Sequence, residues 1–154
     1  MSPALGGASL VVLNRQRGIA FDLALVRRFA EEARVRCAEL FPRGQQSMGY
    51  ASLDEVVVTV VSDAKIDRIH REFMGIEGAT DVITFEHGDV VVSADTALRE
   101  AGVRGHRVEA ELGLYVVHGL LHLNGFDDLS PAPREEMHQV QDSVWSEIRG
   151  SVGC

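Results

Sequence analysis

The sequence predicts an α+β fold in which about four strands form a mixed sheet and about five helices pack on it. Segments with strand-like and helix-like apolar spacing alternate along the chain, in the order strand, helix, strand, helix, two strands and three helices. The third and fourth strands are separated by only three residues, which is short enough for a hairpin. With 154 residues and 45% apolar residues, we expect residues 1–154 to form a single domain with one core.

The first half of the chain supplies two strands and two helices. Residues 10–13, Leu-Val-Val-Leu, predict the first strand, and the apolar spacing over 22–40 predicts a helix that Pro42 and Gly44 end. Residues 43–54 are expected to be loop. The β-branched run at 55–61 predicts a strand covered on both faces. Ser62 or Asp63 then caps a helix to about residue 73.

The second half begins with the hairpin and ends in helices. Strands are predicted at 82–85 and 89–92, and Ser93 is a cap for a helix from 94 to about 100. A long helix follows from about 107 to 124, and Gly125 stands where a left-handed helix stop belongs. Ser130 and Pro131 open a last helix that is expected to stop at Gly150.

The charge pattern limits how the protein can contact its partners. A net charge of −8 argues against non-specific nucleic-acid binding through bulk charge. The charge is uneven, however, because residues 1–43 carry +3 and the remainder carries −11. A phosphate-binding surface would draw on this first third, although a solvated helix face with mixed charges explains the pattern equally well. We expect no membrane span, no secretory signal and a cytoplasmic location.

The segment His-Gly-Leu-Leu-His-Leu-Asn-Gly-Phe-Asp-Asp at 118–128 has the spacing of a metal site. His118 and His122 are one helical turn apart, so both imidazoles project from the same face. Gly125 allows the chain to reverse, which brings the carboxylates of Asp127 and Asp128 back toward the rings. Only one carboxylate is needed as a third ligand, and the other could cap a turn or orient a histidine. Three protein ligands leave a coordination position open for water, as in catalytic zinc sites.

Other polar residues near this segment are weaker candidates. Glu111 lies two turns before His118, so it could orient a ligand, transfer a proton or simply be solvated. Tyr115 is expected to pack, and the remaining histidines are expected at the surface unless they fold beside the site. These are His70, His87, His106 and His138. The residue after His118 is Gly119, so the general-base glutamate of the H-E-x-x-H proteases is missing.

Three segments resemble the YbeY family, whose members are bacterial zinc-dependent endoribonucleases acting in ribosomal RNA maturation. Residues 118–128 agree with the signature H-G-x-L-H-L-x-G-[YF]-D-H at ten of eleven positions. Residues 80–85, Thr-Asp-Val-Ile-Thr-Phe, are similar to the family's T-D-V-L-S-F, and residues 88–93 to its G-D-I-V-I-S. The order and spacing of elements agree from about 55 to 145, which implies a YbeY-like metallohydrolase domain.

The resemblance implies a ligand set and points to two departures. His118 and His122 fall on two of the three metal ligands, and the third, a histidine in the family, falls on Asp128. A carboxylate can replace imidazole on Zn²⁺, the expected ion, but it also makes manganese or magnesium more acceptable. The arginine of the family's Tyr-Arg-Gly segment is Met74 here, and Arg71, one helical turn earlier, is a candidate substitute.

These features lead to three functional hypotheses. The first is a metal-dependent endoribonuclease that acts on single-stranded RNA in ribosomal RNA processing, with metal-activated water as nucleophile and arginines contacting phosphates. Its partners would be ribosomal RNA and the small ribosomal subunit, without an organic cofactor. The second is a ribosome-assembly binding factor with a structural or weakened metal site, and the third is a metallohydrolase for another ester or amide.

Overall fold

The structure, a computed structural model, describes residues 7–45, 49–76, 78 and 80–154. Within these ranges it contains a four-stranded mixed sheet and five α-helices, so the predicted α+β fold is confirmed. The elements in chain order are β1 (Ser9–Asn14), α1 (Leu23–Cys37), the 3₁₀ turn η2 (Gly49–Ser52), β2 (Glu55–Val61), α2 (Asp63–Met74), β3 (Val82–Thr84), β4 (Asp89–Ser93), α3 (Ala94–Arg104), α4 (Val108–Leu123) and α5 (Pro131–Val152).

The sheet is parallel except at one edge. Its strand order is β1-β2-β4-β3, with β1 and β4 parallel to β2 and β3 antiparallel to β4. In this register Val58 pairs with Val12 on one side and with Val90 on the other. All three side chains are buried on the same face, which is therefore the core face. The predicted β3–β4 hairpin is confirmed, and it places β3 at the sheet edge.

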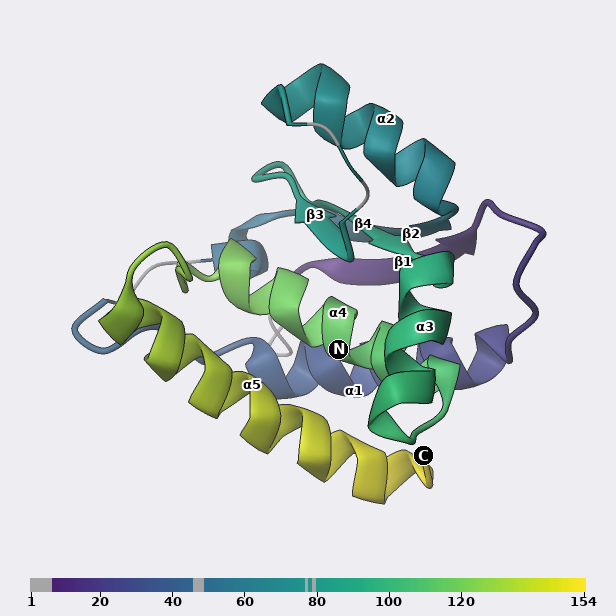
Figure 1. Cartoon of the computed structure of the whole chain (residues 1–154). Helices are drawn as coiled ribbons and strands as arrows, with labels where there is room; N and C mark the ends of the chain where they lie inside the picture. The colour runs from purple at the N-terminus through teal and green to yellow at the C-terminus, as the bar shows by residue number, and fades with distance from the viewer. Residues whose placement is uncertain (1–6, 46–48, 77, 79) are drawn as a thin grey trace.

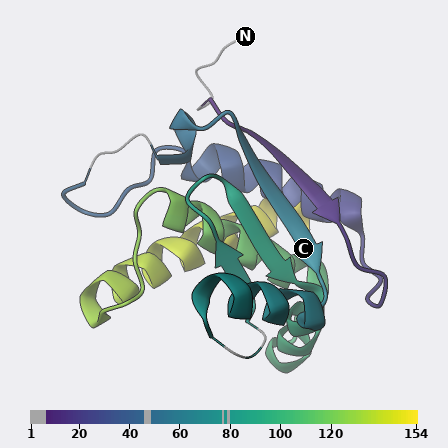
Figure 2. The same cartoon turned by 90° about the horizontal axis from the view of Figure 1, so that it is seen from above.

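Helices cover the two faces of the sheet unequally. Figure 1 shows α1 and α4 beneath the core face, α5 packed outside them, and α2 alone above the opposite face. Viewed from above, β1 lies clear of α2 (Figure 2). Consequently Val57 and Thr59 of β2 are only half-buried, whereas Val61 on the same face is buried in a cluster with Ile66 of α2. The prediction of a strand covered on both faces is therefore met fully on the core face and in part on the other.

The backbone of α4 lies directly against side chains of neighbouring elements, which fixes the helix in the middle of the molecule. Almost all of its residues are buried, so the helix is apolar around most of its circumference. A Cβ on Gly113 would lie 2.5 Å from the Phe29 ring of α1, and a Cβ on Gly119 would lie 2.7 Å from Val90 of β4. Glycine is required at both positions because neither neighbour leaves room for a side chain.

Several element boundaries differ from the sequence predictions, and α1 already ends at Cys37, before the predicted residue 40. α3 continues past Gly102 to Arg104 and ends at Gly105, which has φ +75°. α5 continues through Gly150 to Val152, and the left-handed stop is Gly153. The glycines inside these helices, Gly102 and Gly150, do not end them, and each helix ends at the next glycine, where φ is positive. The region 43–54, predicted as loop, contains η2, and its residues 46–48 lie outside the described part of the chain.

None of the helices in the described ranges combines the length and apolar character that crossing a bilayer requires.

Candidate metal centre

The two histidines project from the last turns of α4 into a cleft. Their side chains retain 19% and 27% exposure for His118 and His122, although most of their helix is buried. Because α4 is held on several sides by packing, the positions of both rings are fixed by the core. The i, i+4 spacing therefore has the predicted effect, and the ring centroids are 4.6 Å apart.

A tight reversal after α4 delivers the carboxylate. Gly125 has φ +99°, as predicted, and the buried Phe126 returns a backbone hydrogen bond to the Leu121 carbonyl at 3.0 Å. Asp127 accepts the Leu129 N–H at 2.6 Å and thus takes the turn-capping alternative. Asp128 instead faces the rings, and the Arg134 guanidinium holds its backbone carbonyl at 3.1 Å.

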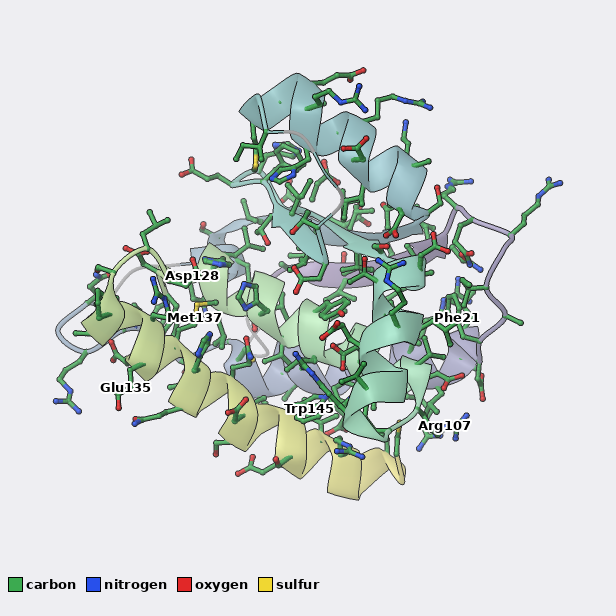
Figure 3. All side chains as sticks on the ribbon, viewed as in Figure 1. Phe21, Arg107, Asp128, Glu135, Met137 and Trp145 are labelled. Carbon is green, nitrogen blue, oxygen red and sulfur yellow. The ribbon has the colours of Figure 1, made fainter. Side chains whose placement is uncertain are left out.

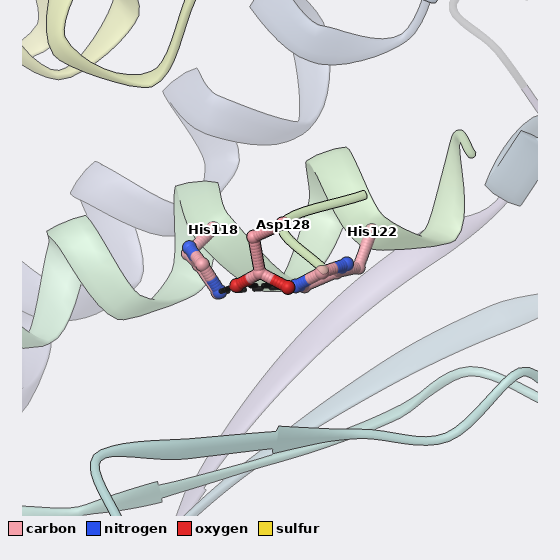
Figure 4. Close-up of side chains that lie close together, drawn as sticks. All are labelled: His118, His122 and Asp128. Atoms are coloured by element: carbon pink, nitrogen blue, oxygen red, sulfur yellow. Dashed lines mark hydrogen bonds and ion pairs between the residues drawn. The ribbon is translucent and has the colours of Figure 1, made fainter. Parts of the chain in front are cut away.

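The three side chains bring acceptor atoms to one point. Figure 4 shows the Asp128 carboxylate between the two imidazoles. Its Oδ2 lies 3.7 Å from Nε2 of His118 and 3.7 Å from Nε2 of His122, and the two Nε2 atoms are 3.0 Å apart. Ligand atoms at ~2.0–2.2 Å from a tetrahedral ion lie about 3.3–3.6 Å from one another. The observed separations bracket these values, so the three residues fit a single divalent ion.

Hydrogen bonds on the far side of each ring set which nitrogen is available. The Nδ1 of His118 donates to Oε1 of Gln141 at 2.7 Å, and the Nδ1 of His122 donates to the carbonyl of Phe126 at 3.0 Å. Each ring therefore presents an unprotonated Nε2 to the common point, which is the tautomer that binds metal. The lone pairs on the two Nε2 atoms and the Asp128 carboxylate face one another, and this arrangement favours binding of a cation. Gln141, on α5, was not predicted, because no local pattern connects it with His118.

The surroundings favour neutral imidazole at His118. Burial lowers the pKa of His118, the Gln141 hydrogen bond opposes that shift, and nearby His122 lowers the pKa further. Neutral histidine is the ligand form, so less proton competition is expected at this nitrogen.

The centre opens into a cleft of about 860 Å³ between α4, the β3 edge and the end of α2. Its described lining includes the carboxylates of Asp81 and Glu86 but no arginine or lysine. His70 also lines it, with Nδ1 3.0 Å from the Gly78 carbonyl. The predicted arginine contacts are thus absent from the described lining, and a bound metal ion would be its main positive charge.

Glu111 lies away from the cleft. It is fully buried near the start of α4, where Oε1 is 2.5 Å from Nε2 of His106 and Oε2 is 3.4 Å from Arg104. Of its predicted roles, the solvated one is wrong, and its partners lie outside the metal cleft. The prediction of a surface His106 is also wrong, because its side chain is only 5% exposed. Tyr115 packs in the core as predicted, where burial and then Glu111 raise its pKa.

Of the two α2 residues considered for phosphate contacts, only Met74 lies at the metal cleft. Met74 lines the metal cleft, at the position where the family pattern has arginine. Arg71 is absent from the described lining and forms an exposed ion pair with Asp67 at 2.5 Å. His87 and His138 are exposed, as predicted.

The chain is thus an α+β protein with a candidate catalytic metal centre, in which the central helix presents two histidines to an open cleft and the turn after it presents a carboxylate. The chain belongs to the YbeY family, since the family model "Endoribonuclease YbeY" matches residues 14–149. The Endoribonuclease YbeY of Limosilactobacillus fermentum is 33% identical over 76% of this chain and 83% of its own length. That of Brevibacillus brevis is 32% identical over 74% and 84%. A solution structure from Thermotoga maritima shares the fold at 24% identity with a TM-score of 0.59, covering 92% of this chain and 90% of that one.

Proposed function

We propose that residues 1–154 form a single metallohydrolase domain that cleaves single-stranded RNA internally in a metal-dependent reaction. The observation that carries this proposal is the convergence of Nε2 of His118, Nε2 of His122 and the Asp128 carboxylate at one point in a cleft. Family membership supplies the reaction class, hydrolysis of RNA phosphodiester bonds.

The protein's own residues prepare this site in three ways. His118, His122 and Asp128 would hold the ion, for which zinc is proposed, with manganese or magnesium as the alternative because one ligand is a carboxylate. Gln141 and the Phe126 carbonyl fix the rings. The acidic lining repels RNA phosphates unless cation is present, so phosphate binding itself depends on the metal.

A bound divalent ion supplies a water of lowered pKa and polarises a phosphoryl oxygen. The three-ligand arrangement leaves room for that water on the cleft side. Ribosomal RNA and the small ribosomal subunit are the proposed partners, the cytoplasm is the proposed location, and no organic cofactor is needed.

The test is cleavage of a single-stranded ribosomal RNA fragment by nuclease-free protein, combined with elemental analysis of protein purified without chelator. We expect about one divalent ion per chain, loss of cleavage in His118→Ala, and loss of metal in Asp128→Ala. Cleavage that persists in metal-free protein contradicts the proposal.

A second candidate, a ribosome-assembly binding factor with a weakened metal site, is favoured by Met74 and by the absence of arginine and lysine from the described cleft lining. It predicts capture of small-subunit particles without RNA turnover. Asp128→His restores the family's third ligand and separates the two candidates. If only this variant cleaves RNA, the natural chain is the binding factor.

A further inference from the structure

A second concave surface lies on the sheet face opposite the core. It is a groove of about 700 Å³ whose floor is formed by Thr59 and Val61 of β2 and Val91 of β4. Figure 2 shows that α2 covers only part of this sheet face. Its walls are Ile69 and Phe73 of α2 and the β3–β4 hairpin.

Two elements, α2 and the β3–β4 hairpin, separate the groove from the metal cleft, and each lines both. Along α2, Lys65, Ile69 and Phe73 follow one another at four-residue spacing and line the groove, whereas His70 and Met74 line the metal cleft. Along the hairpin the residues alternate in the same way. Thr84 and Glu86 line the cleft, and Phe85 and His87 line the groove. An RNA strand that leaves the metal centre and crosses α2 or the hairpin therefore enters the groove.

Three rings line one side of the groove. Phe73 is 68% exposed and meets Phe85 edge-to-face, with centroids 5.6 Å apart and an interplanar angle of 80°. Phe85 in turn stacks on His87, with centroids 5.7 Å apart and an angle of 23°. An aromatic side chain held at this exposure leaves a face open to a further planar group.

The charges at the groove suit an anionic ligand. Arg15 and Lys65 line it, and in the described part of the chain neither forms a side-chain ion pair. The acidic member of the lining, Asp89, is held by the His87 ring. The groove thus offers the two cations that the described lining of the metal cleft lacks.

We infer that this groove is a nucleobase-stacking subsite for the RNA strand whose scissile phosphate lies at the metal centre. The inference rests on the proposed function and extends it to the positions beside the cut. Aromatic rings combined with unpaired cations are how proteins bind single-stranded nucleic acid without reading sequence. An apolar protein segment would use the floor, but it would leave Arg15 and Lys65 without a counter-charge.

The test measures binding of a short fluorescein-labelled uridine oligoribonucleotide to metal-loaded protein by anisotropy, and a gel confirms that the oligomer stays intact during the measurement. Phe73→Ala is expected to weaken binding roughly 5- to 100-fold, and Phe73→Trp is expected to retain it. An abasic oligomer of equal length should bind wild-type protein and Phe73→Ala equally, because it has no base to stack. Val103→Ala is the matched control, since Val103 is 82% exposed and lines neither cavity.

A second arm tests the cations. Arg15→Gln should lower the slope of log affinity against log salt by roughly 0.7, whereas Arg17→Gln, an exposed neighbour outside the groove lining, should leave it unchanged. Equal uridine-oligomer affinity of wild type and Phe73→Ala, an equal loss with the abasic oligomer, or no wild-type binding overturns the inference. The proposed function is judged separately, by metal-dependent cleavage in the wild type.

Discussion

Two clusters of histidine and carboxylate lie at opposite ends of α4, and they differ in how fully their polar atoms are paired. At the start of the helix, Glu111 is enclosed by His106 and Arg104, at 2.5 Å and 3.4 Å. At its end, His118 and His122 stand 3.7 Å from Asp128 and remain partly exposed. Figure 3 places Trp145, which packs edge-to-face on the His106 ring, far along α5 from Asp128.

The difference separates a structural pair from a ligand set. In the first cluster a ring nitrogen meets a carboxylate directly, so its polar atoms satisfy one another. In the second, the Nδ1 hydrogens point outward and the remaining acceptors face one another, so a cation is the missing partner. Residue types are nearly the same in both, and hydrogen-bond direction distinguishes them.

The largest expected effect comes from removing a ligand. His118→Ala should abolish stoichiometric metal and reduce RNA cleavage at least about 100-fold, since even residues that merely orient ligands are worth 10- to 100-fold. His106→Gln, which keeps a donor for Glu111, is the matched control and should retain both metal and cleavage. Elemental analysis and cleavage rates give the comparison. Metal loss in His106→Gln would show that the two clusters are not independent.

Glu111→Ala should destabilise the fold by about 1–3 kcal/mol, because it leaves the buried His106 ring without its acceptor, whereas the half-exposed Arg104 keeps its contact with water. Urea unfolding followed by circular dichroism measures this loss. Metal content per folded chain should stay unchanged. If Glu111→Ala leaves the free energy of unfolding unchanged, the Glu111 cluster contributes little to stability.

Metal removal should lower stability only through the cluster of His118, His122 and Asp128. At free metal of about 100 times its dissociation constant, binding stabilises the folded state by about 2.7 kcal/mol, so chelator should lower the melting temperature. In His118→Ala the same chelator should have no effect. An equal shift in both proteins would place the stabilising ion elsewhere.

Gln141→Leu should weaken metal affinity roughly 10- to 100-fold, because His118 loses the acceptor that orients its ring. Gln139→Leu changes the same residue type at an exposed position of α5 and should leave affinity unchanged. Competition with a chromogenic chelator provides the affinities. If both variants bind metal like the wild type, Gln141 does not position His118.

The sequence predicted the parts of the site that depend on local geometry. The one-turn spacing of His118 and His122 and the positive φ of Gly125 follow from helix periodicity and glycine stereochemistry, so they could be predicted without a fold. The same reversal left Asp127 and Asp128 as alternatives for the third ligand, and the resemblance to the family signature pointed to Asp128.

Partners from distant elements could not be predicted in this way. Gln141 reaches His118 only because α5 packs on α4, and Phe126 contributes a backbone atom that no residue type reveals. Glu111 was considered because two turns separate it from His118. That spacing, however, displaces it about 10 Å along the helix axis, toward α3 and away from the cleft. The ends of α3 and α5 were missed because several glycines compete for each stop, and only φ decides between them.

The contrast between a buried helix and an exposed loop also has a kinetic consequence. The amides around His118 and His122 belong to the most deeply packed helix and should exchange hydrogen only when the whole domain unfolds. Asp128 lies on a surface turn beside Leu129, which is 87% exposed, and such turns move within nanoseconds to microseconds. Asp128 is therefore expected to be the first ligand to release and the last to engage. Substitutions in this turn should then change the residence time of the ion more than they change the coordination geometry of the bound ion.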